Sequence, residues 1–176
     1  LIKKNVIART PQTVETLGAA TIICTDKTGT LTENSMQVAV IYDFATNKYF
    51  NYPAAQVQPN EVLAYAMWSS ESVPFDPMEK SIHTLYEQSF TIDDRPLYKM
   101  VHEYPLDGAP PVMTHVFRNA ANDTIIACKG GVESILRQSV LTDEQKQQML
   151  EVTQQLSAQG YRVLAVAKSA KSYDKF

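Results

Sequence analysis

The sequence is short of the features that mark disulfide-rich, membrane-spanning and nucleic-acid-binding proteins. It has two cysteines, Cys24 and Cys128, which are too few for a disulfide framework or a cysteine-rich metal site. Both lie in apolar runs, so we expect buried, reduced thiols. No stretch approaches the roughly 18 apolar residues that a transmembrane helix needs, which argues against membrane insertion of this part of the chain. The formal net charge of −3 argues against general nucleic-acid binding.

The composition is that of a globular protein. Hydrophobic residues make up 44% and charged residues 20% of the 176 positions, values that exclude an extended disordered chain. This length accommodates one full domain, or one domain and a fragment of another. The first residue is leucine rather than methionine, and we expect the chain to be a piece of a longer protein.

The order of periodic segments predicts an α+β fold with a mainly antiparallel sheet flanked by helices. Apolar or alternating runs predict strands over 19–24, 35–44, 98–106, 111–119, 123–129 and 161–167. Helical spacing predicts helices over 61–70, 76–88 and 142–159. The three consecutive strands between 98 and 129 are separated by polar, proline-containing turns, which favours an antiparallel meander.

Local capping signals mark where the predicted helices begin. Asn60 precedes the first of them and Asp76 precedes the second, with Glu79 three residues later as in a capping box. Thr142 and Gln145 form the same pattern before the third helix. These side chains offer oxygen atoms to backbone N–H groups that have no partner inside the helix.

The segment IICTDKTGTLTEN places an aspartate, Asp26, at the end of an apolar run. Lys27 adds a positive charge, Thr28 and Thr30 add hydroxyls, and Gly29 lets the backbone approach an anion closely. This set suits a carboxylate that attacks the terminal phosphoryl group of a nucleotide. The alternative is that Asp26 only begins a turn, in which Asp and Gly are common residues.

The string DKTGTLTEN resembles the phosphorylation motif of the P-type ATPases, ion pumps that cycle through a phosphoaspartate. The flanking VETLGAATIIC and TENSMQV resemble the type II subgroup, which includes calcium and sodium–potassium pumps. The resemblance implies that Asp26 is the phosphorylated nucleophile and that Lys27 and Thr28 contact the phosphate. It also implies that Asp26 and Thr28 help to hold Mg2+.

Thr28 separates the pump from a related alternative. In the similar haloacid-dehalogenase-type phosphatases, the residue two positions after the nucleophile is usually an aspartate that serves as general acid and base. Threonine cannot activate water in that way, so a long-lived phosphoenzyme is expected. A soluble phosphatase of that type and a non-catalytic nucleotide-binding module remain the two alternative functions.

Four further segments resemble the nucleotide-binding domain of the same family: PFDPMEKSI, HEYPL, CKGGVESIL and YRVLAVA. The resemblance implies that Glu79 contacts adenine, Tyr104 stacks on it and Lys129 lies deep in the pocket. It also implies that Gly130 permits close approach of the nucleotide and that Arg162 faces the phosphates. Without the resemblance, the pattern indicates a helix cap at Glu79 and a core tyrosine at Tyr104. It likewise indicates a solvated lysine before a glycine turn at Lys129 and a surface arginine at Arg162.

Two departures from the family pattern concern the phosphate end of this pocket. Gly131 and Val132 stand where the family has alanine and proline, which puts nucleotide affinity in doubt more than the location of the pocket. The stretch DGAPPVM lacks the lysine that many members carry there. Neutralisation of the phosphates would then rest on Lys129 and Arg162.

The resemblance also implies a domain organisation. Residues 1–34 correspond to a fragment of the α/β haloacid-dehalogenase-like phosphorylation domain, 35–168 to the nucleotide-binding domain and 169–176 to the start of a return hinge. The expected partners are ATP, Mg2+ and the remaining phosphorylation, actuator and transmembrane domains of the same parent chain. We expect this portion to lie on the cytosolic side of a membrane, such as the plasma membrane, to bind ATP without turnover by itself, and to belong to a pump for which calcium is favoured over protons.

Overall fold

The structure, a computed structural model, describes residues 12–22, 24–27, 29–53, 58–106 and 111–169. The chain divides into two compact units, Leu1–Ser35 and Met36–Phe176. Antiparallel sheets flanked by helices confirm the predicted α+β class. Within the described ranges, every helix is too short or too polar to cross a bilayer.

The first unit contains helix α1 (Gln12–Gly18), followed by turns and irregular backbone. The strand predicted over 19–24 is not formed at the positions described there, which are exposed. A strand is stable only when a neighbour pairs with its backbone groups, and the described part of this unit offers no such neighbour. Cys24 is therefore an exposed thiol rather than the buried one that we expected.

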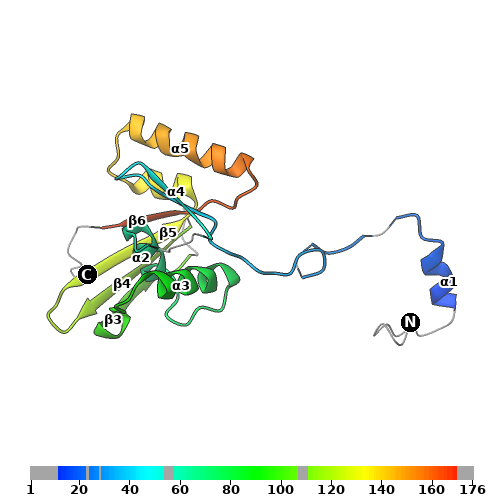
Figure 1. Cartoon of the computed structure of the whole chain (residues 1–176), viewed down its shortest axis with the longest axis horizontal. Helices are drawn as coiled ribbons and strands as arrows, with labels where there is room; N and C mark the ends of the chain where they lie inside the picture. The colour runs from blue at the N-terminus through cyan, green and yellow to red at the C-terminus, as the bar shows by residue number, and fades with distance from the viewer. Residues whose placement is uncertain (1–11, 23, 28, 54–57, 107–110, 170–176) are drawn as a thin grey trace. The chain divides into compact units, whose positions relative to one another are not determined.

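The second unit is built on a four-stranded sheet in the order β3-β4-β5-β6 (Figure 1). Its strands are β3 (Tyr98–Tyr104), β4 (Val112–Asn119), β5 (Thr124–Gly130) and β6 (Ala165–Lys168). All neighbours pair antiparallel, which confirms the meander. The last strand begins at Ala165, so Arg162 precedes it instead of lying within it.

A bulge in β3 resets the pairing between β3 and β4. Met100 lies opposite Phe117 and His102 lies opposite Val116, so Val101 is an extra residue on one strand only. Residues directly opposite each other place their side chains on the same face of a sheet. The bulge thereby decides which side chains of the last residues of β3 face each layer of helices.

Helices cover both faces of this sheet. α2 (Glu61–Trp68) and α3 (Pro77–Ser89) pack on one face, where Trp68 meets the ring of Phe117 at a centroid distance of 4.8 Å. α4 (Val132–Gln138) packs on the other face, and α5 (Asp143–Ala158) contacts α4. The larger core is formed by Ile41, Leu63, Ala66, Met67, Trp68, Ile82, Leu85, Tyr86, Phe117 and Ala127.

A hairpin of β1 (Val40–Asp43) and β2 (Lys48–Asn51) packs against α2. The strand predicted over 35–44 is thus shorter than expected, and β2 was not predicted. A short 3-10 helix, η2 (Arg95–Leu97), leads into β3. These pieces complete the second unit.

The helix caps follow the sequence signals with one exception. Asn60 Oδ1 accepts a hydrogen bond from the backbone N of Leu63 at 2.7 Å. The box of Thr142 and Gln145 is present with both of its hydrogen bonds. Asp76 caps α3 through the N–H of Met78 at 2.8 Å, but no capping box forms with Glu79. That carboxylate instead pairs with Lys129, which is the start of the candidate site.

Candidate functional site

Lys129 lies at the centre of the candidate site. Its ammonium group forms an ion pair with the carboxylate of Glu79 and donates a hydrogen bond to Ser70 Oγ at 3.0 Å. Lys129 is 6% exposed and Glu79 is 4% exposed. The three residues come from the end of β5, the first turn of α3 and the turn after α2. The sheet and both helices of one layer therefore meet at this pair.

Burial makes the two charges depend on each other. A lysine or glutamate removed from water is strongly penalised unless an opposite charge and hydrogen bonds replace its hydration. The partners of Lys129 are a carboxylate and a hydroxyl. Lys129 is therefore a buried, paired lysine and not the solvated lysine of the alternative interpretation. The sequence pattern pointed to Lys129 and Glu79 individually, but no signal linked them to Ser70, whose position follows from the end of α2.

His83 borders this buried pair from the next turn of α3. Burial, followed by the positive charge of Arg95, lowers the pKa of the His83 imidazole below its ordinary value. The Nη1 atom of Arg95 lies 3.2 Å from Nδ1 of His83. Because a guanidinium only donates, Nδ1 accepts and the imidazole is neutral. No sequence signal points to His83.

Gly130 is required by the packing of its own sheet. A Cβ atom at this position would lie 2.9 Å from the backbone oxygen of Pro111 and 3.3 Å from Val112. The neighbouring strand thus approaches the backbone directly after Lys129, where a larger residue would push the strands apart. Gly131 then serves as the N-cap of α4 without a side-chain hydrogen bond.

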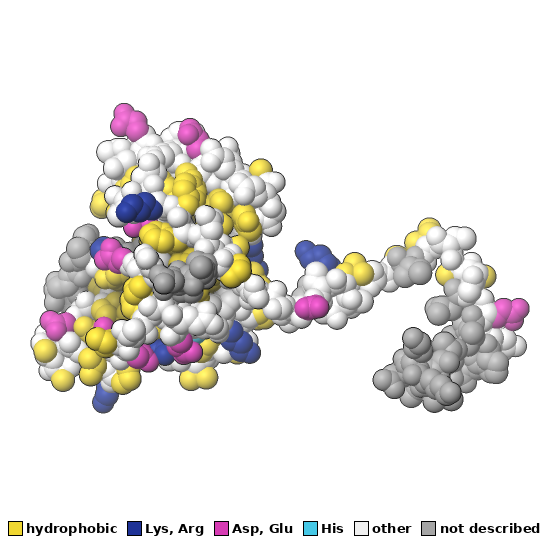
Figure 2. Space-filling model, viewed as in Figure 1, with side chains coloured by type: hydrophobic (Ala, Val, Ile, Leu, Met, Phe, Trp, Pro, Cys, Tyr) yellow, Lys and Arg dark blue, Asp and Glu magenta, His cyan; other side chains and the backbone are white. Residues whose placement is uncertain are grey.

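A cavity of about 210 Å³ connects Lys129 with Arg162. Its walls are mainly apolar and come from β1, α2, α5 and the start of β6, including Val152 and Leu156 of α5. Figure 2 shows hydrophobic side chains gathered beneath α5 on the viewed face. Arg162 itself is exposed. One buried and one exposed cation therefore line the same apolar hollow.

Tyr104 lies on the other face of the sheet. It is opposite Thr114, whereas Lys129 is opposite Met113. Because neighbouring residues of a strand point to opposite faces, Tyr104 and Lys129 lie on different sides. The Tyr104 ring instead contacts His102, with a centroid distance of 4.3 Å. The structure thus brings Glu79 and Lys129 together, places Arg162 at the same cavity as Lys129, and leaves Tyr104 apart from them.

In the first unit, Asp26 begins a turn. The backbone N of Lys27 donates to Asp26 Oδ1 at 2.7 Å, and the backbone oxygen of Lys27 accepts from Leu31 and Thr32 at 3.0 and 3.1 Å. Gly29 has a φ of +75°, a backbone conformation that favours glycine. The turn predicted as the structural alternative is therefore formed, and it exposes the Asp26 carboxylate. Thr28 lies outside the described residues.

The surroundings of Asp26 do not by themselves fit Mg2+. Mg2+ takes six oxygen ligands, of which proteins usually supply one or two carboxylates. Over the positions that the structure describes, Asp26 belongs to no group of three carboxylate, imidazole or thiol ligands. Asp26 therefore offers a single exposed carboxylate to an ion at this turn.

Comparisons with known proteins give matches over almost the whole chain. Calcium-transporting ATPase 1 of Bacillus cereus is 29% identical over 95% of the chain and 21% of its own length. Magnesium-transporting ATPase, P-type 1 of Salmonella typhimurium is 26% identical over 94% of the chain and 18% of its own length. Plasma membrane ATPase 2 of Saccharomyces cerevisiae is 23% identical over 96% of the chain and 17% of its own length. The chain is similar to P-type ATPases over about 95% of its length, at 23–29% identity.

No protein-family model matches the chain. It spans about a fifth of the length of the curated P-type ATPases that it matches. The segment that matches these ATPases includes the sheet, the buried ion pair and the turn at Asp26.

Proposed function

We propose that this chain is the ATP-binding, cytosolic portion of a cation-transporting P-type ATPase. The observation that carries the proposal is the buried pair of Lys129 and Glu79 at a mainly apolar cavity that Arg162 also lines. The names of its relatives as ATPases support the same reading. Calcium is the transported ion that we favour, in keeping with the type II character of the flanks of the motif.

The cavity suits the two ends of a nucleotide. Its apolar walls offer contacts to the faces of a purine, while Lys129 and Arg162 offer positive charge to phosphates. Glu79 is an acceptor for an exocyclic amine once part of its pairing with Lys129 is given up. Gly130 leaves the end of β5 free of a side chain. Tyr104 remains a predicted stacking residue, although it faces the opposite layer.

For the whole parent protein, we propose that Asp26 is phosphorylated. A carboxylate oxygen of Asp26 forms a bond to the terminal phosphorus of ATP, the bond to the bridging oxygen breaks, and ADP leaves. Lys27 and Thr28 are the residues proposed to contact the transferred phosphate. Mg2+ is the proposed companion ion, held by Asp26 and Thr28 together with carboxylates that this chain does not supply at its described positions. By itself the chain is expected to bind ATP without hydrolysing it.

A titration of the 176-residue chain with ATP, followed by amide chemical shifts, tests nucleotide binding. We expect shifts at Glu79, Lys129 and Arg162, and the response of Tyr104 decides its predicted role. Arg162→Gln should weaken binding about tenfold, the effect of losing one charge-assisted contact. Arg137→Gln, an exposed arginine of α4, is the matched control. An ATP titration that leaves all of these amides unshifted would refute the proposed pocket.

Phosphorylation is tested separately in the intact parent protein. Asp26→Asn should abolish acid-stable, hydroxylamine-sensitive labelling by ATP, because an amide cannot form the acyl phosphate. Nucleotide binding should survive the change. Labelling that persists in this variant would show that another residue is the nucleophile.

A further inference from the structure

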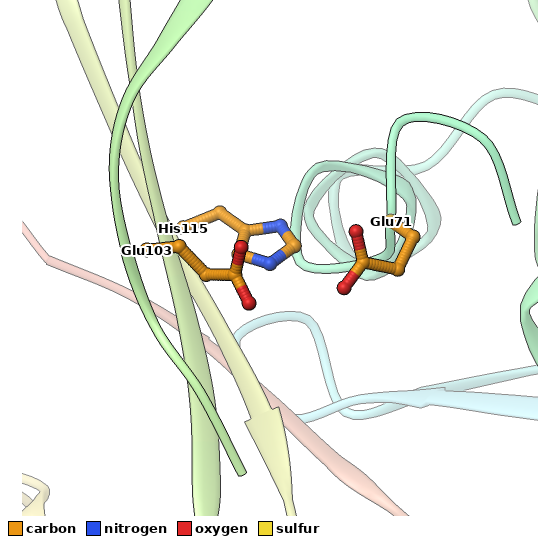
Figure 3. Close-up of side chains that lie close together, drawn as sticks. All are labelled: Glu71, Glu103 and His115. Carbon is orange, nitrogen blue, oxygen red and sulfur yellow. The ribbon is translucent and has the colours of Figure 1, made fainter.

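Three side chains that can coordinate a metal ion lie close together, and none of them lines the cavity of Lys129 and Arg162. Glu71 lies in the turn after α2, Glu103 on β3 and His115 on β4. One ligand atom of each residue lies within 4.8 Å of the others. Figure 3 shows the carboxylates and the imidazole pointing toward one another from three separate segments.

The sheet holds two of these residues in place. Glu103 and His115 lie directly opposite each other in the β3–β4 pairing, so their side chains share one face. Glu71 approaches from the helical layer that covers the same face. The cluster therefore has a rigid base on the sheet and a third arm on a turn, which is a suitable frame for a ligand of fixed geometry.

The imidazole of His115 supplies the observation that points to a ligand. His115 is 0% exposed, and neither ring nitrogen has a hydrogen-bond partner among the residues that the structure describes. Buried polar groups in native proteins nearly always have a partner. A neutral imidazole offers one nitrogen lone pair, which is the group that transition metals bind most commonly in proteins.

We propose that Glu71, Glu103 and His115 bind one divalent transition-metal ion, with Zn2+ as the ion that this ligand set suits best. One imidazole and two carboxylates match the mixed nitrogen and oxygen ligands of zinc, and the two negative charges balance the ion. Mg2+ and Ca2+ prefer oxygen ligands throughout. Three protein ligands leave a fourth tetrahedral position for water.

The spacing is compatible with metal binding after a small inward movement. Zinc–ligand bonds of about 2.1 Å place tetrahedral ligands roughly 3.4 Å apart, against the 4.8 Å limit within which these atoms lie. Glu103 is exposed and Glu71 is half-buried, so both carboxylates have room to close on the fixed imidazole. The exposed side of Glu103 also gives the ion a path from solvent.

Calorimetric titration of the untagged chain with ZnCl2 tests the site. The chain should carry Cys24→Ser, because the exposed thiol of Cys24 is an unrelated zinc ligand. We expect one equivalent to bind. Glu71→Gln and Glu103→Gln should each weaken binding at least about tenfold, since each removes a direct ligand. Glu151→Gln, an exposed residue of α5, is the control and should leave affinity unchanged.

His115 is tested through the resonances of its imidazole ring and not by substitution, because a change at a fully buried position endangers folding. Zinc should shift the ring-nitrogen resonances of His115, while those of His83 stay in place. Equal amounts of MgCl2 should leave both unchanged. Binding that is insensitive to both glutamate substitutions, zinc shifts at His83 instead of His115, or the absence of zinc binding would each overturn the proposal. None of these outcomes depends on whether ATP binds.

Discussion

Two lysine–glutamate pairs join the helices of one layer to the sheet, and their surroundings differ sharply. Lys129 of β5 meets Glu79 of α3 with side chains that are 7% and 6% exposed. Lys168 of β6 meets Glu61 of α2 with side chains that are 53% and 60% exposed. The same kind of ion pair, between a strand lysine and a glutamate in the first turn of a helix, thus occurs once in the interior and once in solvent.

The difference shows which pair the fold depends on. In water, an ion pair exchanges good hydration for a screened attraction and contributes little. In the interior, hydration is already lost, so either charge without its partner is strongly unfavourable. Under the proposed function, a nucleotide would take over part of this pairing, so both folding and binding would depend on the buried pair. The exposed pair carries no comparable constraint.

The largest effect is expected from Lys129→Met. The substitution keeps an unbranched apolar side chain but leaves Glu79 as an uncompensated buried charge. The free energy of unfolding should fall by about 3–5 kcal/mol, as measured by urea denaturation monitored by circular dichroism. A loss below 1 kcal/mol would mean that Glu79 finds water or another partner, and that the pair is not structurally important.

Replacing both partners sharpens the comparison. In the variant carrying Glu79→Met and Lys129→Met, no unpaired charge remains, so most of the lost stability should return. The coupling energy from a double-mutant cycle should therefore be at least about 3 kcal/mol. ATP binding should not return with it, because the positive charge is absent. Recovery of both properties would assign the nucleotide to other residues.

Acidification should affect the surroundings of the buried pair through His83. Its pKa is lowered in the folded chain, first by burial and then by Arg95, from an ordinary value of 6.5. As the pH falls through about 6.5, the unfolded chain gains a proton that the folded chain does not, and the free energy of unfolding falls. His83→Gln, which keeps an acceptor for Arg95, should flatten this slope in urea titrations at pH 7.5, 6.5 and 5.5. An unchanged slope would show that a group other than His83 causes the pH dependence of the free energy of unfolding.

The smallest effect is expected from Lys168→Met. Glu61 raises the pKa of the Lys168 ammonium, but both groups stay largely hydrated after the pair is lost. The free energy of unfolding should change by about 0.2–1 kcal/mol. This variant is the matched control for Lys129→Met, since both remove a lysine from a strand. A loss as large as that of Lys129→Met would remove the distinction between the two pairs.

The parts of the fold that could be predicted depend on neighbouring residues in sequence. The cap at Asn60, the box of Thr142 and Gln145 and the meander over 98–130 each carry a local signal that the structure confirms. The strand expected over 19–24 depends on partners elsewhere, and those are absent from the described part of its unit. Local pattern alone cannot report such a requirement.

The candidate site was predictable only in part for the same reason. Lys129 and Glu79 were named from motifs, but their contact joins positions fifty residues apart. The motif match for Tyr104 did not reveal which face of the sheet it occupies. Ser70, His83 and His115 carry no signal at all, because their importance arises from burial and from neighbours that only the packed chain brings near.

The bulge at Val101 determines the identity of the side chain that faces His115. If β3 paired regularly from Met100 with Val101 opposite Val116, His102 would stand opposite His115, and Glu103 would turn to the other layer. The extra, unpaired residue thereby places a carboxylate, and not a second imidazole, opposite His115. The chemistry available on this face of the sheet is therefore governed by an inserted valine whose own side chain takes no part in it.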